Sequence, residues 1–293
     1  MSAVRDAGRR LVGRNYAASK RYALWQMRGA ERPVVVFSMG KTGSTAIARA
    51  VHDATGGRVF QVFRLEPTRL AEAEQRYLAS PRGPAGRGDV PFPGALHLWE
   101  SEYLLRHPPT ADAPWNVITT VREPVAQAVS AFFHGTGRRG LLAGGPSLET
   151  LEQTLLSEQW LRAPLRWFDR EFLPVLGVDV FGEEFDPAVG HAVIETSSAR
   201  VLLLRQENLG AAPEAVARFL GRAGTVPVPA RNEASTKDYG ARYREFLAAV
   251  RLTDPVLDEV YNSRYTRHFY ADSEVERFRR RWRDGMEPTA TPT

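Results

Sequence analysis

The sequence predicts an α/β fold of three layers, with a mostly parallel central sheet, a phosphate-binding loop after the first strand, and helices on both faces. Two segments carry this prediction, because at 33–47 and at 115–133 an apolar run typical of a buried strand passes directly into a helix. The third observation is the order of elements along the chain. Strands expected at about 34–38, 95–99, 115–121 and 200–205 are separated by helical material. That alternation is typical of parallel sheets that bind ligands at the C-terminal ends of their strands.

A basic segment precedes this sheet. In residues 1–30 seven Arg and Lys side chains are interspersed with apolar ones such as Leu24 and Trp25, which predicts a weakly amphipathic helix. We interpret it as a solvated helix packed on the domain; the alternative is a surface that makes peripheral contact with an anionic membrane or glycan. Residues 31–283 are expected to form a single α/β domain, and residues 284–293 a disordered tail.

The first strand leads into the segment Ser38-Met-Gly-Lys41-Thr-Gly-Ser-Thr45, which opens a helix expected at 44–54. Such a loop directs backbone N–H groups and a helix N-terminus at an anion. It differs from the nucleoside triphosphate loop GxxxxGK[ST], because the Gly required five positions before Gly40 is replaced by Val35. Lys41 is one of three lysines among 39 basic residues. A compact ammonium in this loop therefore indicates chemistry at one atom rather than general charge.

Several helices and loops are expected between the strands. A helix at 66–79 precedes a loop rich in Pro and Gly at 80–94. The Gly-rich segment His134–Pro146 is expected to be mobile and could serve as a lid. Four aromatic side chains at helical spacing are expected in the core rather than as a sugar platform: Trp160, Trp167, Phe168 and Phe172.

The strand expected at 115–121 ends at Arg122, and Pro124 suits the first turn of a helix. Ser130 lies nearly two helical turns further, back on the face where this helix begins. Arg122 and Ser130 are therefore placed to share one ligand.

With these two motifs in this order, the sequence resembles the sulfotransferases that use 3′-phosphoadenosine 5′-phosphosulfate (PAPS). Residues 201–209 and 213–221 resemble a later strand and helix of the same superfamily. Within it, residues 166–172 and 177–181 and the late polar cluster resemble a bacterial group described as putative capsular polysaccharide synthesis proteins. That cluster consists of Asn232, Lys237, Tyr239 and Tyr243. The resemblance extends over about residues 33–270.

The resemblance implies a role for each motif. PAPS would be the co-substrate, without a metal, and its sulfuryl group would pass in line to a hydroxyl of a carbohydrate or other hydroxylated metabolite. Lys41 would lie near the oxygen that bridges sulfur and the 5′-phosphate, and Arg122 and Ser130 would hold the 3′-phosphate. The 5′-phosphate would be held by the loop residues Thr42, Gly43, Ser44 and Thr45. Lys237 would lie near nucleotide phosphate or acceptor, although a helix start with its aromatic face in the core explains this cluster equally well.

The acceptor hydroxyl needs a general base. In the resembled family this base often follows the strand between the two phosphate motifs, which corresponds here to residues 95–103. We assign it to Glu100, because Glu100 falls at the expected strand end. His97 is the alternative, and Glu102 is read as a cap of the following helix.

Composition narrows the function classes. The chain has 293 residues and no cysteine, which excludes disulfides, thiolate nucleophiles and zinc–thiolate sites, and its six histidines show no metal-ligand spacing. No apolar stretch suits a transmembrane helix or a secretory signal, so a cytoplasmic location is expected. The formal charge of +5 favours anionic ligands, but no nucleic-acid-binding motif is present, and no nucleic-acid partner is expected. A nucleotide-dependent phosphotransferase and a non-catalytic nucleotide or glycan binder remain alternatives, and the oligomeric state stays open.

Overall fold

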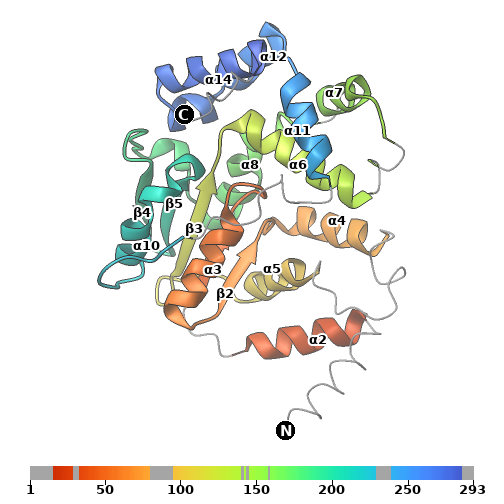
Figure 1. Ribbon diagram of the computed structural model, residues 1–293. Helices are drawn as coiled ribbons and strands as arrows, with labels where there is room; N and C mark the ends of the chain where they lie inside the picture. Colours follow the sequence, from red (N-terminus) through yellow and green to blue (C-terminus); the bar gives the residue numbers. More distant parts are fainter. Residues whose placement is uncertain are drawn as a thin grey trace.

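A computed structural model describes residues 16–28, 33–79, 95–139, 142, 145–157, 159–228 and 239–285. Its sheet has five strands in the order β2-β1-β3-β5-β4 (Figure 1). The four strands β2, β1, β3 and β5 are parallel, and β4 pairs antiparallel with β5. The bounds of the strands are β1 Val34–Phe37, β2 Val59–Val62, β3 Trp115–Val121, β4 His191–Glu195 and β5 Ala199–Arg205. The predicted α/β class with a mostly parallel sheet is confirmed.

Helices surround this sheet. The N-terminal half contains α2 Tyr16–Met27, α3 Ser44–Thr55, α4 Pro67–Leu78, α5 Leu96–Arg106, α6 Pro124–Arg139 and α7 Leu148–Ser157. The middle of the chain contains α8 Ala163–Trp167, the π-helix η1 Phe168–Phe172, α9 Leu173–Leu176, and the 3₁₀ turns η2 Val180–Gly182 and η3 Gln206–Ala211. The remaining helices are α10 Pro213–Phe219, α11 Gly240–Ala249, α12 Asp254–Tyr261, α13 Arg264–Phe269 and α14 Asp272–Asp284.

Alternating strand residues divide the core between the two sheet faces. Val35, Val117 and Val201 are in register across β1, β3 and β5, and they pack with residues of α5, η1 and α13. Their neighbours Val36, Ile118 and Leu202 face the other way and pack against α3 and α10. Because strands buried on both faces consist of continuous apolar runs, the central strands were recognisable in the sequence. The three expected layers are present.

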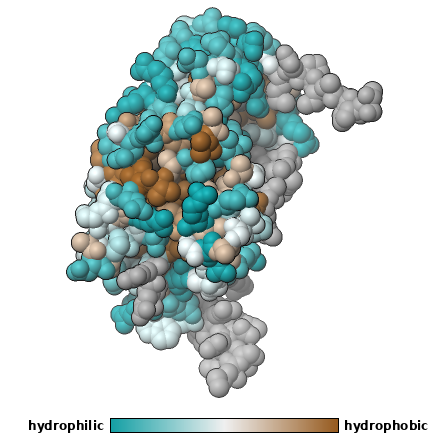
Figure 2. Space-filling model, turned by 90° about the vertical axis from the view of Figure 1, so that its left-hand side faces the viewer, coloured by the Kyte–Doolittle hydropathy of each residue, from teal (hydrophilic) through white to brown (hydrophobic). Residues whose placement is uncertain are grey.

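A third apolar cluster lies beyond the C-terminal end of β3, where α6 packs with α7, α11, α12 and α14 (Figure 1). Figure 2 views the side that lies on the left in Figure 1, where β4 and α10 are. Its surface is mostly hydrophilic, with one patch of hydrophobic side chains. Val193, on the outer strand β4, is 47% exposed.

Three predictions of local structure are corrected. The strand expected at 95–99 is the start of α5, whose buried side chains Leu98, Trp99 and Tyr103 follow helical rather than alternating spacing. The strands β2 and β4, of four and five residues, were not predicted. The segment 134–139, expected to be mobile, continues α6. A Cβ on Gly135 would lie 2.7 Å from the Trp160 ring, so this glycine permits close packing there.

The basic N-terminal segment is described from Tyr16, where α2 packs on the domain. The ammonium of Lys20 forms salt bridges with Glu74, at 2.7 Å, and with Glu102, at 2.5 Å. Residues 1–15, the loop expected at 80–94 and residues 286–293 of the expected tail lie outside the described residues. Within the described ranges no helix is both long enough and apolar enough to span a bilayer.

Candidate functional site

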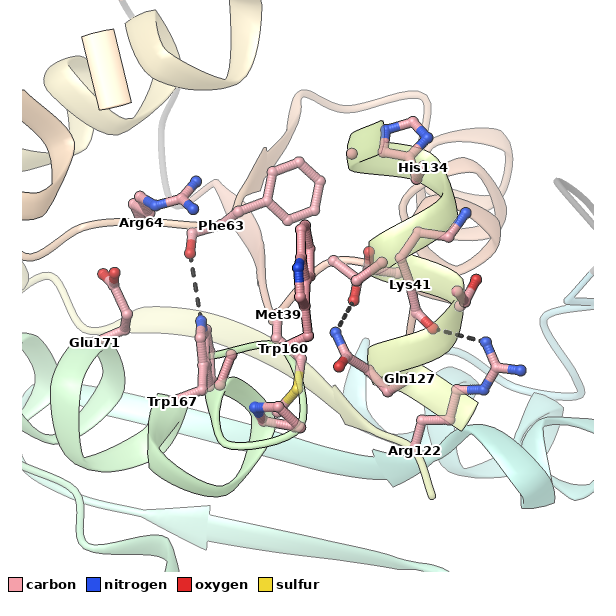
Figure 3. Close-up of a pocket in the computed structure, with 18 of the residues that line it drawn as sticks. Met39, Lys41, Phe63, Arg64, Arg122, Gln127, His134, Trp160, Trp167 and Glu171 are labelled. Atoms are coloured by element: carbon pink, nitrogen blue, oxygen red, sulfur yellow. Dashed lines mark hydrogen bonds between the residues drawn. The ribbon is translucent and has the colours of Figure 1, made fainter. Parts of the chain in front are cut away.

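A pocket of about 850 Å³ lies at the C-terminal ends of β1, β2 and β3 (Figure 3). In the sheet, β2 is the neighbour of β1 on one edge and β3 is its neighbour on the other, so the strand order reverses at β1. The pocket lies at this point. Parallel α/β sheets bind ligands at such points. Its walls come from the loop after β1, the residues that follow β2, one face of α6, and residues 159–171.

The loop between β1 and α3 has a backbone suited to an anion. Lys41 has φ 72° and Gly43 has φ 87°, both in the left-handed region. A Cβ on Gly43 would lie 2.7 Å from Leu209 Cδ1, so a larger residue would displace Leu209 and would be strained at this φ. Gly43 caps α3 without a side-chain hydrogen bond, and the first turn of α3 has no acidic residue to compete with a bound anion. The first amides of a helix have no partner within the helix and attract negative charge.

Three side chains fix this loop against β3 and α6. Gln127 Nε2 donates to the Gly40 carbonyl at 2.7 Å, and Arg122 Nη1 donates to the Lys41 carbonyl at 3.0 Å (Figure 3). The buried Thr42 hydroxyl donates to the Met39 carbonyl at 2.8 Å and lies 2.6 Å from the Thr120 hydroxyl. The Thr42 side chain therefore holds the loop in place and does not line the pocket, so only its backbone can contact a ligand there.

Ser44 and Thr45 line the pocket at the start of α3. Their hydroxyls accept hydrogen bonds from the side-chain amide of Gln61, at 3.3 Å and 2.9 Å respectively. Gln61 belongs to β2, so the edge strand orients both hydroxyls. The sequence analysis missed this contribution because it missed β2.

Arg122 and Ser130 both line the pocket, as their spacing predicted. The pocket-facing side of α6 carries Gln127, Ser130 and His134, at successive intervals of three and four residues. The same helical spacing that placed Ser130 would have placed His134, which the sequence analysis did not select as a site residue.

The turn that carries Arg122 is held by the C-terminal helices. The fully buried Tyr265 accepts from the Arg122 N–H at 3.1 Å and donates to the Arg122 carbonyl at 2.8 Å. The neighbouring Glu123 carboxylate is also buried and accepts from four donors: the Val125 and Ala126 N–H groups, the Tyr261 hydroxyl and the Trp282 indole. Glu123 thus caps α6 and ties it to α12 and α14. Sequence reasoning did not identify this carboxylate.

The residues considered for the general base separate in the structure. His97 lines the pocket, and its ring meets the ring of Phe63 edge-on, with centroids 5.3 Å apart. Glu100 does not line it: its side chain is 7% exposed, and its Oε2 accepts from the Gln61 N–H at 3.1 Å. Burial raises the pKa of Glu100 to about 7. Glu102 lies inside α5 and forms a salt bridge with Lys20 of α2. It therefore does not cap the start of α5.

The end of the pocket away from Arg122 contains residues that sequence reasoning missed. Arg64 and Glu171 lie there, beside Trp167, whose indole donates to the Phe63 carbonyl at 3.4 Å (Figure 3). Glu171 is fully buried and accepts from the Leu65 and Glu66 N–H groups and from Arg69 Nε. Since its oxygens are already bonded to three donors, Glu171 holds this wall in place.

The late polar and aromatic residues have mixed outcomes. Asn232 and Lys237 lie outside the described residues. Tyr239 and Tyr243 pack against Phe133, and Tyr243 also lines the pocket. Trp167, Phe168 and Phe172 are in the core as expected, although Trp167 also lines the pocket, and so does the half-buried Trp160.

The pocket is strongly basic. Its lining has seven lysine and arginine side chains and one carboxylate, Glu171. The basic residues are Lys41, Arg64, Arg69, Arg122, Arg162, Arg166 and Arg170. Among the described residues, no group of three or more His, Asp or Glu side chains has the arrangement of a metal site. Such a lining favours a ligand with several negative charges.

Comparison with known proteins gives one match. Residues 153–271 match the model of a family described as putative capsular polysaccharide synthesis protein. The matched range includes the pocket wall at 159–171 and Tyr265, which bonds to the Arg122 backbone, but neither the loop after β1 nor Arg122 itself. No curated protein and no solved structure matches the chain.

Proposed function

We propose that this protein is a sulfotransferase that moves the sulfuryl group of PAPS to a hydroxyl of a glycan or a related hydroxylated compound. The observation that carries the proposal is the meeting of Lys41, Arg122 and Ser130 with the N-terminus of α3 at one end of one pocket. An ammonium, a guanidinium fork, a hydroxyl and helix amides are the groups that bind phosphates in proteins. The glycan-related family match supports an acceptor of that class.

The residues present fit a nucleotide with two separate phosphate groups. The left-handed backbone at Lys41 and Gly43 and the amides that open α3 would hold the 5′-phosphosulfate, with the Ser44 and Thr45 hydroxyls beside them. Arg122 and Ser130 would hold the 3′-phosphate. PAPS supplies an activated sulfuryl group, whose bond to the 5′-phosphate breaks as the acceptor oxygen bonds to sulfur. Lys41 stabilises the charge that develops on the leaving phosphate.

The acceptor proton goes to His97 in this proposal. His97 comes from α5 and contacts Phe63, toward the end of the pocket away from Arg122, whereas His134 lies one turn beyond Ser130 on α6, beside Lys41 (Figure 3). Glu100, favoured by the sequence, is bonded to the backbone of β2 instead.

Nucleotide binding tests the proposal. We expect 3′,5′-ADP to bind about ten- to a hundredfold more tightly than 5′-AMP, because the 3′-phosphate gains charge-assisted hydrogen bonds. Arg122→Ala should remove most of this preference in calorimetry. Since Arg122 also holds the Lys41 carbonyl, Ser130→Ala is the second variant and should weaken 3′,5′-ADP while leaving 5′-AMP unchanged. Equal affinities for the two nucleotides, or tighter binding of ATP with magnesium, would contradict the proposal.

A further inference from the structure

The wall opposite the phosphate end carries a row of arginines. Arg162, Arg166 and Arg170 recur every four residues, from the residue before α8 into the π-helix η1, and all three line the pocket. At helical rise this row extends over roughly 12 Å. Arg64, which follows β2, lines the same end (Figure 3).

The counter-charges of this wall are unevenly distributed. Arg162 forms a two-point salt bridge with Glu259, and Arg69 pairs with Glu171. Within the described ranges, Arg64, Arg166 and Arg170 form no salt bridge with any carboxylate. The loss of hydration lowers the pKa of the Arg64 guanidinium. Arg166 and Arg170 are exposed, and the half-buried Arg64 also interacts electrostatically with Glu171. Guanidinium groups that form no salt bridge remain available to an anionic ligand.

This charge exceeds what the nucleotide accounts for. Its phosphates are assigned to Lys41, the helix amides, Arg122 and Ser130, which lie on the loop after β1 and on the turn after β3. The arginines of the wall opposite the phosphate end come from other elements and line the same pocket as His97, to which the proposed function assigns the acceptor proton. The aromatic side chains of Phe63 and Trp167 also line this end of the pocket and provide apolar surface.

We propose that the acceptor is itself an anion: a saccharide whose carboxylate groups bind Arg64, Arg166 and Arg170 while its hydroxyl faces His97. This inference rests on the proposed function for the identity of the reaction, but the binding of the acidic saccharide can be measured without it. Planar guanidinium groups match carboxylates in a two-point geometry.

The test compares two matched ligands on the whole protein without nucleotide. The probe is a disaccharide that contains glucuronic acid, and its control is the same disaccharide with the carboxyl reduced to an alcohol. We expect the acidic form to bind at least about tenfold more tightly in calorimetry, as one charge-assisted contact predicts. Arg64→Gln and Arg170→Gln should each remove most of this preference. Arg222 is exposed and does not line the pocket, so Arg222→Gln should leave the preference for the acidic disaccharide unchanged.

A competition arm locates the binding site. Saturating 3′,5′-ADP should not displace the acidic disaccharide, because the two ligands occupy different ends of the pocket. Displacement, or equal affinity for the acidic and neutral disaccharides, would overturn the inference. If the arginine variants lose the acidic preference while 3′,5′-ADP binds no better than 5′-AMP, the acidic site stands and the sulfotransferase proposal fails.

Discussion

Lys41 combines two properties that proteins usually assign to different residues. It supplies the ammonium of the proposed phosphate loop, and its own backbone adopts the left-handed conformation, with φ 72°. That conformation costs a non-glycine residue roughly 1–2 kcal/mol. The sequence indicated the charge, but it gave no sign of the backbone conformation, because glycine is the residue expected at such a position.

Replacing Lys41 should separate these two properties. Lys41→Gly and Lys41→Ala should both lower turnover by about a hundredfold or more, because both remove the charge that stabilises the leaving phosphate. Lys41→Arg should also be a poor substitute, since a guanidinium fork cannot occupy the same point. In urea denaturation, however, the Gly variant should be about 1 kcal/mol more stable than the Ala variant. Full turnover in either neutral variant would exclude the role of the ammonium.

The proposed function assigns the proton transfer to His97. His97→Asn keeps a polar side chain of similar size and should lower kcat by roughly 10²–10⁴-fold, the usual effect of a positioned base. The acidic limb of the pH profile should disappear, while the affinity for 3′,5′-ADP stays unchanged. His134→Asn is the matched control, because it changes the other imidazole of the pocket. If His134→Asn loses turnover and His97→Asn does not, the assignment of the base is reversed.

At the scale of elements, the two phosphate motifs were predictable because local signals agree over their whole length. The strand expected at 115–121 is mostly β-branched and buried on both faces, and Pro124 starts the next helix where its missing N–H has no cost. Helix α5 failed as a prediction because residues 95–99 are too few to separate a period of two from one of 3.6. Because these residues are helical, Glu100 lies in the buried face of α5 and not at the end of a strand. The assignment of the base to Glu100 depended on that strand end.

The buried position of Glu100 has a measurable pH dependence. Its pKa rises from 4.5 in the unfolded chain to about 7 in the folded protein. Between these values the folded state binds more protons than the unfolded state, so the free energy of unfolding falls as pH rises from about 4.5 to 7. The full penalty, about 3 kcal/mol, applies above pH 7.

Glu100→Gln should remove this penalty. The variant keeps an oxygen that can accept from the Gln61 N–H and carries no charge. It should come within about 0.3 kcal/mol of the wild type in urea denaturation at pH 4 and be more stable at pH 8, by up to about 3 kcal/mol. Its turnover should stay close to that of the wild type, because Glu100 is outside the pocket. A large loss of turnover with the fold intact would return the role of base to Glu100.

At the scale of the whole molecule, the sequence could not predict which distant segments support the site. Arg205, at the end of β5, is 2% exposed and forms a two-point salt bridge with Glu274 of α14, at 2.5 Å and 3.0 Å. Tyr265 and Glu123 likewise join the turn after β3 to helices more than a hundred residues later. Nothing in the local pattern of either segment identifies its partner, since these contacts depend on the final packing of α12, α13 and α14.

The Arg205 pair provides a test of this long-range support. Glu274→Ala leaves a buried guanidinium without its closest carboxylate and should lower the free energy of unfolding by about 3 kcal/mol. Glu276→Ala, two residues along the same helix and exposed, should change it by less than about 0.5 kcal/mol. Equal effects of the two substitutions in urea denaturation would show that α14 contributes little through this contact.

The Glu123 contacts also determine when the pocket can form during synthesis. The carboxylate that caps α6 receives donors from Tyr261 and Trp282, which are 138 and 159 residues further along the chain. A ribosome adds roughly 5–20 residues per second, so many seconds separate the emergence of the phosphate motifs from that of the residues that stabilise them. Until then the Glu123 carboxylate has only the N–H donors of α6 and lacks the Tyr261 and Trp282 donors. The nascent chain should therefore acquire its affinity for nucleotide late and in one step, once α14 has left the ribosome.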